Sequence, residues 1–164
     1  MLKASWRMAW LVVSAMLAGG IAAGASAQAV DPAVGTWKMN LAKSKLAPGD
    51  RAAGLKGSMV KIDAVGKAFK VAIENVDAAG KTSTWGYTTE PNGPDGPASG
   101  SQAVDAVSST GAPSSGTVTY KKAGKVVNTF AIQVSPDGKT LTLTAKVSDP
   151  QGKEVTSVIV YDKQ

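Results

Sequence analysis

The feature that most limits the fold of this sequence is an alternation of apolar and polar residues, repeated from position 56 to the C-terminus. Each run ends at a turn rich in Gly, Asp or Pro, such as residues 135–138. Alternation places successive side chains on opposite faces of a strand, and short turns join antiparallel neighbours. The pattern therefore predicts an antiparallel meander, with no helix in the segment that follows the N-terminal region.

Eight or nine strands fit this pattern. We expect them near residues 35–41, 60–64, 69–74, 84–88, 102–108, 117–121, 126–134, 140–147 and 154–162. The Pro-rich segment 91–101 is expected to be a loop, because Pro has no amide to donate to a neighbouring strand. So large a sheet must curl, split or close. The sequence predicts an all-β, up-and-down closed barrel, whose interior is either filled by side chains or holds one small ligand.

The N-terminal segment, residues 1–27, has the organisation of a secretory signal peptide. Lys3 and Arg7 form a basic stretch, residues 8–18 are apolar, and Ala25-Ser26-Ala27 is a small-residue cleavage site. A membrane span is the alternative, but the second half of the segment is rich in Gly and Ala, and no basic cluster follows it. We expect export through the general secretory route.

Cleavage after Ala27 leaves residues 28–164 as one domain, and cleavage after Ala29 fits the same pattern. The chain contains no Cys, which excludes lipid anchoring at the cleavage site and a disulfide framework. The expected location of the mature protein is the periplasm or the extracellular medium, without a lipid anchor and without a membrane span.

The charge and composition of the mature part argue against several classes of function. Residues 28–164 carry 16 Lys and Arg against 12 Asp and Glu, and the cations are spread along the chain. Nucleic-acid sites gather Arg and Lys with aromatic residues, so no nucleic-acid partner is expected. The chain has no His, and its carboxylates are scattered singly, so we expect neither a metal site nor a cofactor.

Catalysis finds little support in the residue pattern. Ser58 and Lys61 fit an S-x-x-K spacing, but on a strand the first and fourth residues point to opposite faces. No close pair of carboxylates and no Gly-rich phosphate loop is present in the sequence. We therefore expect that the protein is not an enzyme. An unrecognised enzyme that acts through Lys or carboxylate side chains is the least favoured hypothesis.

The first predicted strand carries the most specific motif. Gly35-Thr36-Trp37-Lys38 resembles the G-x-W opening of lipocalins and fatty-acid-binding proteins, the calycin group. The resemblance implies that Gly35 and Trp37 begin the first strand and that the Trp packs across the closed end of a barrel. Lipocalins usually place an Arg on this Trp. Here Lys163, just past the last strand, is the available substitute, and an ammonium lacks the planar surface of a guanidinium.

A longer run, residues 35–45, resembles the opening GTWKxNxxKSK of a group of largely uncharacterised exported bacterial proteins. Those proteins end in a similar meander, and residues 158–162 of this chain, Val-Ile-Val-Tyr-Asp, occupy the place of their last strand. The resemblance implies a fold across nearly the whole mature chain and says little about function.

Large side chains on the predicted inward faces are the candidate ligand contacts. An amide on an inward face needs hydrogen-bond partners, which makes Asn128 a candidate as well. The candidates are Phe69, Trp85, Tyr87, Tyr120, Asn128 and Phe130. The leading hypothesis is an exported lipocalin-like protein that binds a small hydrophobic molecule inside the barrel. The alternative is a cell-envelope structural or interaction protein whose barrel is filled.

Counting strands assigns each connection to one end of the barrel. If residues 35–41 form the first strand, the end opposite its start receives the connections 42–56, 77–81, 109–115 and 135–139. By the resemblance, this end would be the open mouth. The longest connection, 42–56, contains the lone mature Arg, Arg51, and either acts as a lid or is a solvated surface loop.

Overall fold

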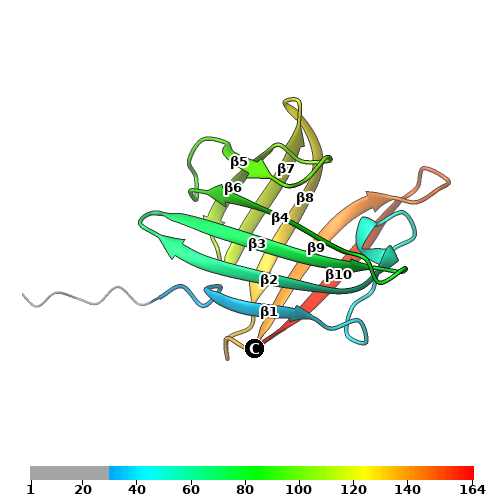
Figure 1. Cartoon of the computed structure of the whole chain (residues 1–164), viewed down its shortest axis with the longest axis horizontal. Helices are drawn as coiled ribbons and strands as arrows, with labels where there is room; N and C mark the ends of the chain where they lie inside the picture. The colour runs from blue at the N-terminus through cyan, green and yellow to red at the C-terminus, as the bar shows by residue number, and fades with distance from the viewer. Residues whose placement is uncertain (1–29) are drawn as a thin grey trace, which may run out of the picture.

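Ten antiparallel strands close into one barrel in the computed structural model, which describes residues 30–164 (Figure 1). Strands that are adjacent in sequence are adjacent in the sheet, and the first strand pairs with the last to complete the ring. The strands are β1 (Gly35–Met39), β2 (Leu55–Val65), β3 (Ala68–Asp77), β4 (Thr82–Thr89), β5 (Gly96–Ser99), β6 (Ala106–Ala112), β7 (Ser115–Lys122), β8 (Lys125–Val134), β9 (Thr140–Ser148) and β10 (Glu154–Lys163). The predicted all-β, up-and-down barrel is confirmed. The predicted signal peptide and both cleavage sites lie outside the described residues.

The predicted number of strands was too low, because β5 was taken for a loop. Its residue Pro97 pairs with Ala106 of β6, and Ala98 pairs with Tyr87 of β4. Each of these two ladders contains only two residue pairs, so the missing amide of Pro97 interrupts little. A strand was expected at residues 102–108, but only residues 106–108 of this range lie in a strand. They form the start of β6, which begins at Ala106.

Because consecutive strands run in opposite directions, the extra strand moves every later connection to the end of the barrel opposite the one that was predicted. The connections around 109–115 and 135–139 therefore lie at the same end as the start of β1, and their expected place at the mouth was wrong. The mouth is formed instead by the connections that leave β1, β3, β5, β7 and β9. A single short strand decides which loops surround the cavity.

Trp37 lies near the start of β1, at the end of the barrel away from the mouth. Its side chain is fully buried, and its indole Nε1 donates a hydrogen bond of 2.8 Å to the Ala33 carbonyl. Lys163 Nζ lies 4.9 Å from the centre of the indole ring and donates a hydrogen bond to the Pro32 carbonyl. Lys163 therefore supplies the cation over the Trp37 ring, at the position where an Arg was expected and none is present. Gly35 lies against this Lys, since a Cβ there would come within 2.8 Å of Lys163 Cε.

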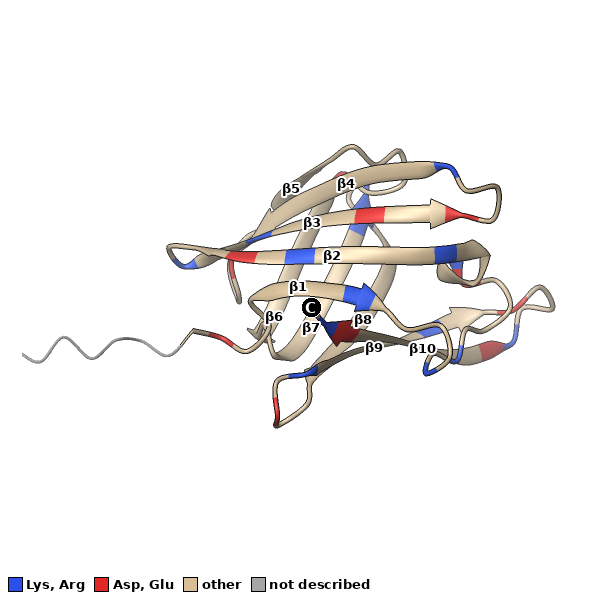
Figure 2. Cartoon of the chain, turned by 60° about the horizontal axis from the view of Figure 1, so that its bottom comes forward, with Lys and Arg blue, Asp and Glu red and all other residues tan. Residues whose placement is uncertain are grey.

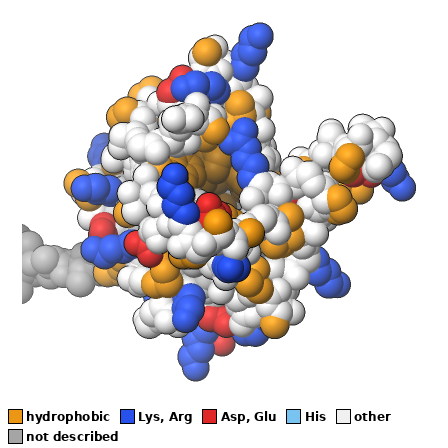
Figure 3. All heavy atoms as spheres, turned by 45° about the vertical axis from the view of Figure 1, so that its right-hand side comes forward, with side chains coloured by type: hydrophobic (Ala, Val, Ile, Leu, Met, Phe, Trp, Pro, Cys, Tyr) orange, Lys and Arg blue, Asp and Glu red, His pale blue; other side chains and the backbone are white. Residues whose placement is uncertain are grey.

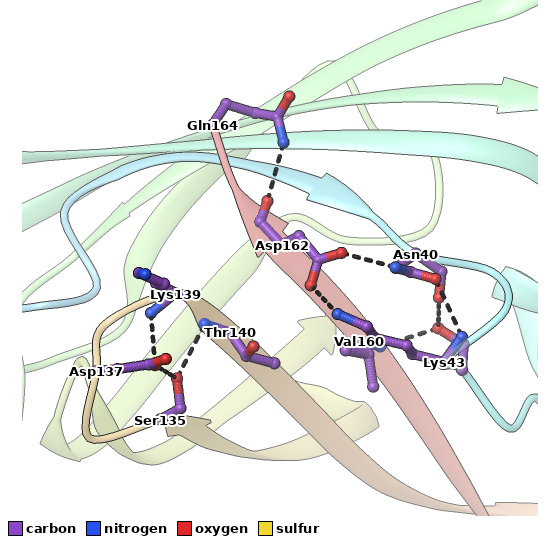
Figure 4. A network of polar contacts seen from close by, with 10 residues as sticks. Asn40, Lys43, Ser135, Asp137, Lys139, Thr140, Val160, Asp162 and Gln164 are labelled. Atoms are coloured by element: carbon purple, nitrogen blue, oxygen red, sulfur yellow. Dashed lines mark hydrogen bonds and ion pairs between the residues drawn. The ribbon is translucent and has the colours of Figure 1, made fainter.

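The segment after β1 is fastened to β10 by polar contacts (Figure 4). Asn40 Nδ2 donates to Asp162 Oδ2 at 2.6 Å, and Lys43 Nζ contacts Asp162 Oδ1 at 2.8 Å. Ser44 Oγ donates to the Asn40 carbonyl and accepts a hydrogen bond from the Val160 amide. The Asn-x-x-Lys-Ser part of the 35–45 motif thus stabilises the seam where the barrel closes.

Charged side chains are distributed over several strands and turns of the barrel, as Figure 2 shows. Five ion pairs join Lys to Asp or Glu within the described residues, and most of the partners are well exposed. Exposed pairs contribute little to stability. In the part of the chain that the structure describes, no helix has the length and apolar character needed to cross a bilayer.

Candidate ligand-binding cavity

The barrel encloses a cavity of about 860 Å³. Figure 3 shows the hollow, with hydrophobic side chains inside it and Lys and Arg side chains near its rim. Cavities that hold small molecules in proteins usually measure roughly 300–1,000 Å³ and are lined mainly by apolar side chains. The space inside this barrel therefore has the size and character of a small-molecule site.

Alternation along the strands supplies the walls of the cavity. In β2 and β3 four inward aliphatic side chains line the cavity, Val60, Ile62, Val71 and Ile73, each less than a tenth exposed. Strands β8, β9 and β10 add further apolar wall residues, which include Ile132, Leu141, Leu143 and Ile159. These aliphatic residues were not among the predicted ligand contacts, which were chosen for the size of their side chains. The same alternation that predicted the strands would have identified them.

Four aromatic residues form a continuous cluster on one side of the cavity. Tyr120 lies at its centre, with ring centroids 5.3 Å from Trp85, 5.8 Å from Tyr87 and 5.3 Å from Phe130. The contacts are tilted or edge-to-face, the arrangements that aromatic quadrupoles favour. The cluster gives the cavity a rigid wall of ring edges and faces.

The phenol groups of this wall are held in their neutral form. Burial raises the pKa of Tyr87 from 10.0 to about 12, although the neighbouring Tyr120 phenol acts in the opposite direction. Burial also raises the pKa of Tyr120 well above its ordinary value, and the nearby Tyr87 adds to this effect. At neutral pH the wall therefore presents two uncharged hydroxyl groups within a largely apolar surface.

Five of the six candidate ligand contacts border the large cavity: Trp85, Tyr87, Tyr120, Asn128 and Phe130. Asn128 is half-buried, and its Oδ1 accepts a hydrogen bond from the Thr129 amide, which leaves its amide nitrogen for other partners. Phe69 lies elsewhere. It packs against the core near the opposite end of the barrel and borders a separate space of about 50 Å³.

The segment between β1 and β2 covers part of the mouth. It contains a short 3-10 helix, η1 (Arg51–Gly54), although no helix was expected there. Ala47, Asp50 and Ala52 are each at least nine-tenths buried, and Asp50 and Ala52 line the cavity. Gly49 lies against the β9–β10 connection, because a Cβ on it would come within 2.7 Å of the Ser148 carbonyl. We call residues 46–54 the lid segment.

Asp50 introduces a charged group at this edge of the cavity. Its Oδ1 caps η1 by accepting a hydrogen bond of 2.8 Å from the Ala52 amide. Its Oδ2 is buried and has no hydrogen-bond partner among the described residues. Loop residues of this kind carry no periodic pattern, so neither the burial of Asp50 nor its place beside the cavity could be read from the sequence.

Among residues 30–164, no group of three or more metal-binding side chains is present. The S-x-x-K spacing is divided by the sheet as expected: Ser58 is buried, whereas the side chain of Lys61 is 60% exposed and pairs with Asp63 outside the barrel. A nucleophile and base must lie within hydrogen-bonding reach of each other. Ser58 and Lys61 are therefore not such a pair.

Comparison with known proteins gives similarity at the level of structure. No protein-family model and no curated protein matches the sequence. A crystal structure of zebrafish ileal bile acid-binding protein complexed with cholic acid is 12% identical, with a TM-score of 0.48, and the match covers 81% of this chain and 99% of that one. The siderocalin Ex-FABP, described as having dual ligand specificities, is 13% identical, with a TM-score of 0.38 and coverage of 81% and 71%. What this cavity binds has to be inferred from its own side chains.

Proposed function

We propose that this protein is an exported, lipocalin-like binding protein that holds one small, mostly apolar molecule inside its barrel. The observation that carries the proposal is the cavity of about 860 Å³, bordered by aliphatic and aromatic side chains. A barrel whose role was purely structural would be expected to fill this space with side chains, because protein interiors are close-packed and keep few voids larger than a water molecule. The retained cavity favours the carrier over the filled-barrel alternative.

The proposed ligand enters at the mouth near the lid segment. The rim contains two cationic side chains, Arg51 and Lys146, and the apolar space lies behind them. Lys146 is paired with Glu154 at 2.8 Å, so its charge is largely balanced. A molecule with a long or ring-shaped apolar body and a small polar end matches this arrangement of an apolar interior behind a polar rim.

The experiment that tests this function is direct identification of a bound molecule. The protein is purified from its native host under mild conditions, denatured and extracted, and the extract is analysed by mass spectrometry. In parallel, an uncharged fluorescent probe such as N-phenyl-naphthylamine is titrated into the stripped protein. We expect a stoichiometric small molecule and saturable probe binding that quenches Trp85.

Two controls make the result specific. The variant Trp85→Phe removes the quenched fluorophore at the cavity wall and leaves Trp37, which is buried at the other end of the barrel. The quenching should then disappear while the probe's own fluorescence still saturates. An empty extract together with a probe that does not saturate would reject the carrier function.

Export itself is proposed on the residues that predict it, the basic, apolar and small-residue order of positions 1–27. The test is expression of the full chain in its host, followed by fractionation and N-terminal sequencing of the secreted or periplasmic form. A start at Gln28 or Val30 would support processing at one of the two predicted sites. Retention of the intact N-terminus in the membrane fraction would contradict it.

A further inference from the structure

Two buried polar atoms have no hydrogen-bond partner within the described residues: Asp50 Oδ2, in the lining of the cavity, and Ser58 Oγ, on β2. Their residues are 8% and 4% exposed, respectively. A buried polar atom without a hydrogen bond costs about 1–3 kcal/mol, and a charged one costs more. Native structures rarely keep such atoms without a reason, and a ligand that satisfies them is one such reason.

The two atoms belong to one polar corner of the barrel. Ser58 lies on the inward face of β2, on the same face as the cavity residues Val60 and Ile62. Asp50 belongs to the lid segment and Tyr161 to β10, and both line the cavity. Burial raises the pKa of the Tyr161 phenol, the Ser58 hydroxyl beside it opposes the rise, and the charge of Asp50 adds to it.

The chemistry of this corner is that of a hydrogen-bond acceptor with negative charge. No cation of the described residues lies within ion-pair distance of Asp50, since the ion pairs there all involve other carboxylates. A carboxylate oxygen accepts hydrogen bonds and does not donate them when ionised, and Ser and Tyr hydroxyls can accept as well. The corner therefore attracts donors and repels anions.

We propose that Asp50, Ser58 and Tyr161 recognise the polar end of the ligand, and that this end is a hydrogen-bond donor, an alcohol or an amine, rather than a carboxylate. This inference rests on the proposed carrier function and adds the chemical class of the ligand. Asp50 Oδ2 and Ser58 Oγ are covered by neighbouring protein atoms. A donor group reaches them when the lid segment shifts outward by a small amount, and the new hydrogen bonds then relieve the cost of the unpaired atoms.

The test compares ligands that differ only at the polar end. Dodecylamine, dodecanol and dodecanoate, each below its critical micelle concentration, displace N-phenyl-naphthylamine from the stripped, full-length mature protein at neutral pH. We expect the amine to bind about ten-fold or more tightly than the carboxylate, since hydrogen bonds to charged groups contribute about 1.5–3 kcal/mol. The alcohol should fall between them.

The variant Asp50→Asn removes the charge but keeps an N-cap, because Asn caps helices about as well as Asp. It should lower the ratio of amine to carboxylate affinity by about five-fold or more. The matched control Asp63→Asn changes a carboxylate on the outer face of β2, where Asp63 pairs with Lys61. The control should leave the ratio unchanged. If Asp50→Asn does not fold, Ser58→Ala provides the second measurement, and it should weaken amine and alcohol binding without weakening dodecanoate.

The possible failures are distinguishable. If all three ligands bind equally and neither Asp50→Asn nor Ser58→Ala changes their ratio, the polar corner is not a recognition site, although the carrier function stands. Tighter binding of dodecanoate that is lost in Arg51→Gln would place anion recognition at the rim and overturn the inference. If neither the probe nor any ligand binds, the carrier function fails and the inference fails with it.

Discussion

The residues of the Gly35-Thr36-Trp37 motif lie together with Lys163 at the start of β1. Trp37 was predicted to pack across the end of the barrel; in the structure its side chain is fully buried near the start of β1, and its indole nitrogen donates a hydrogen bond to the Ala33 carbonyl. Lys163 covers the ring, although the C-terminus offers no Arg. Lys163 thus contacts both the Trp37 ring and the backbone at Gly35, where a Cβ would come within 2.8 Å of Lys163 Cε.

Replacement of Lys163 by Met tests the strength of these contacts. The variant keeps most of the apolar stem and removes both the charge over Trp37 and the hydrogen bond to Pro32. We expect the free energy of unfolding to fall by about 0.5–2 kcal/mol, measured by urea denaturation. The control Lys67→Met alters an exposed turn between β2 and β3 and should have no such effect. Equal stability of the two variants would show that the cation contributes nothing.

The buried phenols predict how stability depends on alkaline pH. Tyr87 has a pKa of 10.0 when unfolded and about 12 when folded. Between these values the unfolded chain loses its proton first, so the stability present below pH 10 is lost as the pH rises towards 12. The fall approaches about 1.4 kcal/mol per pH unit for each such Tyr.

The variant Tyr87→Phe isolates this effect from the many Lys residues that titrate in the same range. Its unfolding free energy should fall less steeply above pH 10 than that of the unmodified protein, while the two curves run parallel near pH 8. Absorbance titration of tyrosinate would give the folded pKa independently. Identical slopes for both proteins would contradict the raised pKa.

At the scale of elements, the short strand β5 has the largest consequence. It adds one strand between β4 and β6 and so moves all later connections to the opposite ends of the barrel. The strand β5 could not be predicted from the sequence, because Pro97 argues against a strand and because β5 forms only two residue pairs with each of its neighbours. Only the close packing of backbones at Gly96, beside the Thr88 carbonyl, permits the pairing.

Replacement of Gly96 by Ala should therefore destabilise the barrel. The added Cβ would overlap the Thr88 carbonyl oxygen and force β5 away from β4. We expect a loss of about 1–3 kcal/mol in the free energy of unfolding, the usual cost of an overpacked site. Gly57→Ala is the matched control, since a Cβ there meets no atom within 4 Å. Amide hydrogen exchange should show the loss of protection confined at first to β4–β6 in the Gly96 variant, and uniform protection would argue against this role of β5.

The whole molecule is a closed barrel of ten strands around a cavity of about 860 Å³. Trp37 is fully buried near the start of β1, and the seam between β1 and β10 is stabilised by contacts of Asn40 and Lys43 with Asp162. Stability comes from this closure and from the walls, without disulfides, since the chain has no Cys. The interior is thereby free for a ligand.

A larger side chain on one wall of the cavity should weaken ligand binding without unfolding the barrel. Leu143→Trp adds bulk into the space that Leu143 borders on β9. We expect N-phenyl-naphthylamine affinity to fall about ten-fold or more while the barrel stays folded by circular dichroism. Ala131→Trp places the same side chain on the exposed outer face of β8 and should leave the affinity unchanged. Equal binding by both variants would mean that the probe lies outside the barrel.

Alternation and turn chemistry are local properties of the chain, so the class of fold and most of the inward-facing residues could be predicted from the amino-acid sequence. Trp85, Tyr87, Tyr120, Asn128 and Phe130 could be chosen in this way, and they border the cavity. Which end is the mouth, that Phe69 lies near the other end, and that Ser58 and Asp50 both lie near enough to Tyr161 to act on its pKa became visible only in the folded barrel. These depend on closure of the whole ring, where one added strand changes the parity of the loops and residues far apart in sequence come to share a wall.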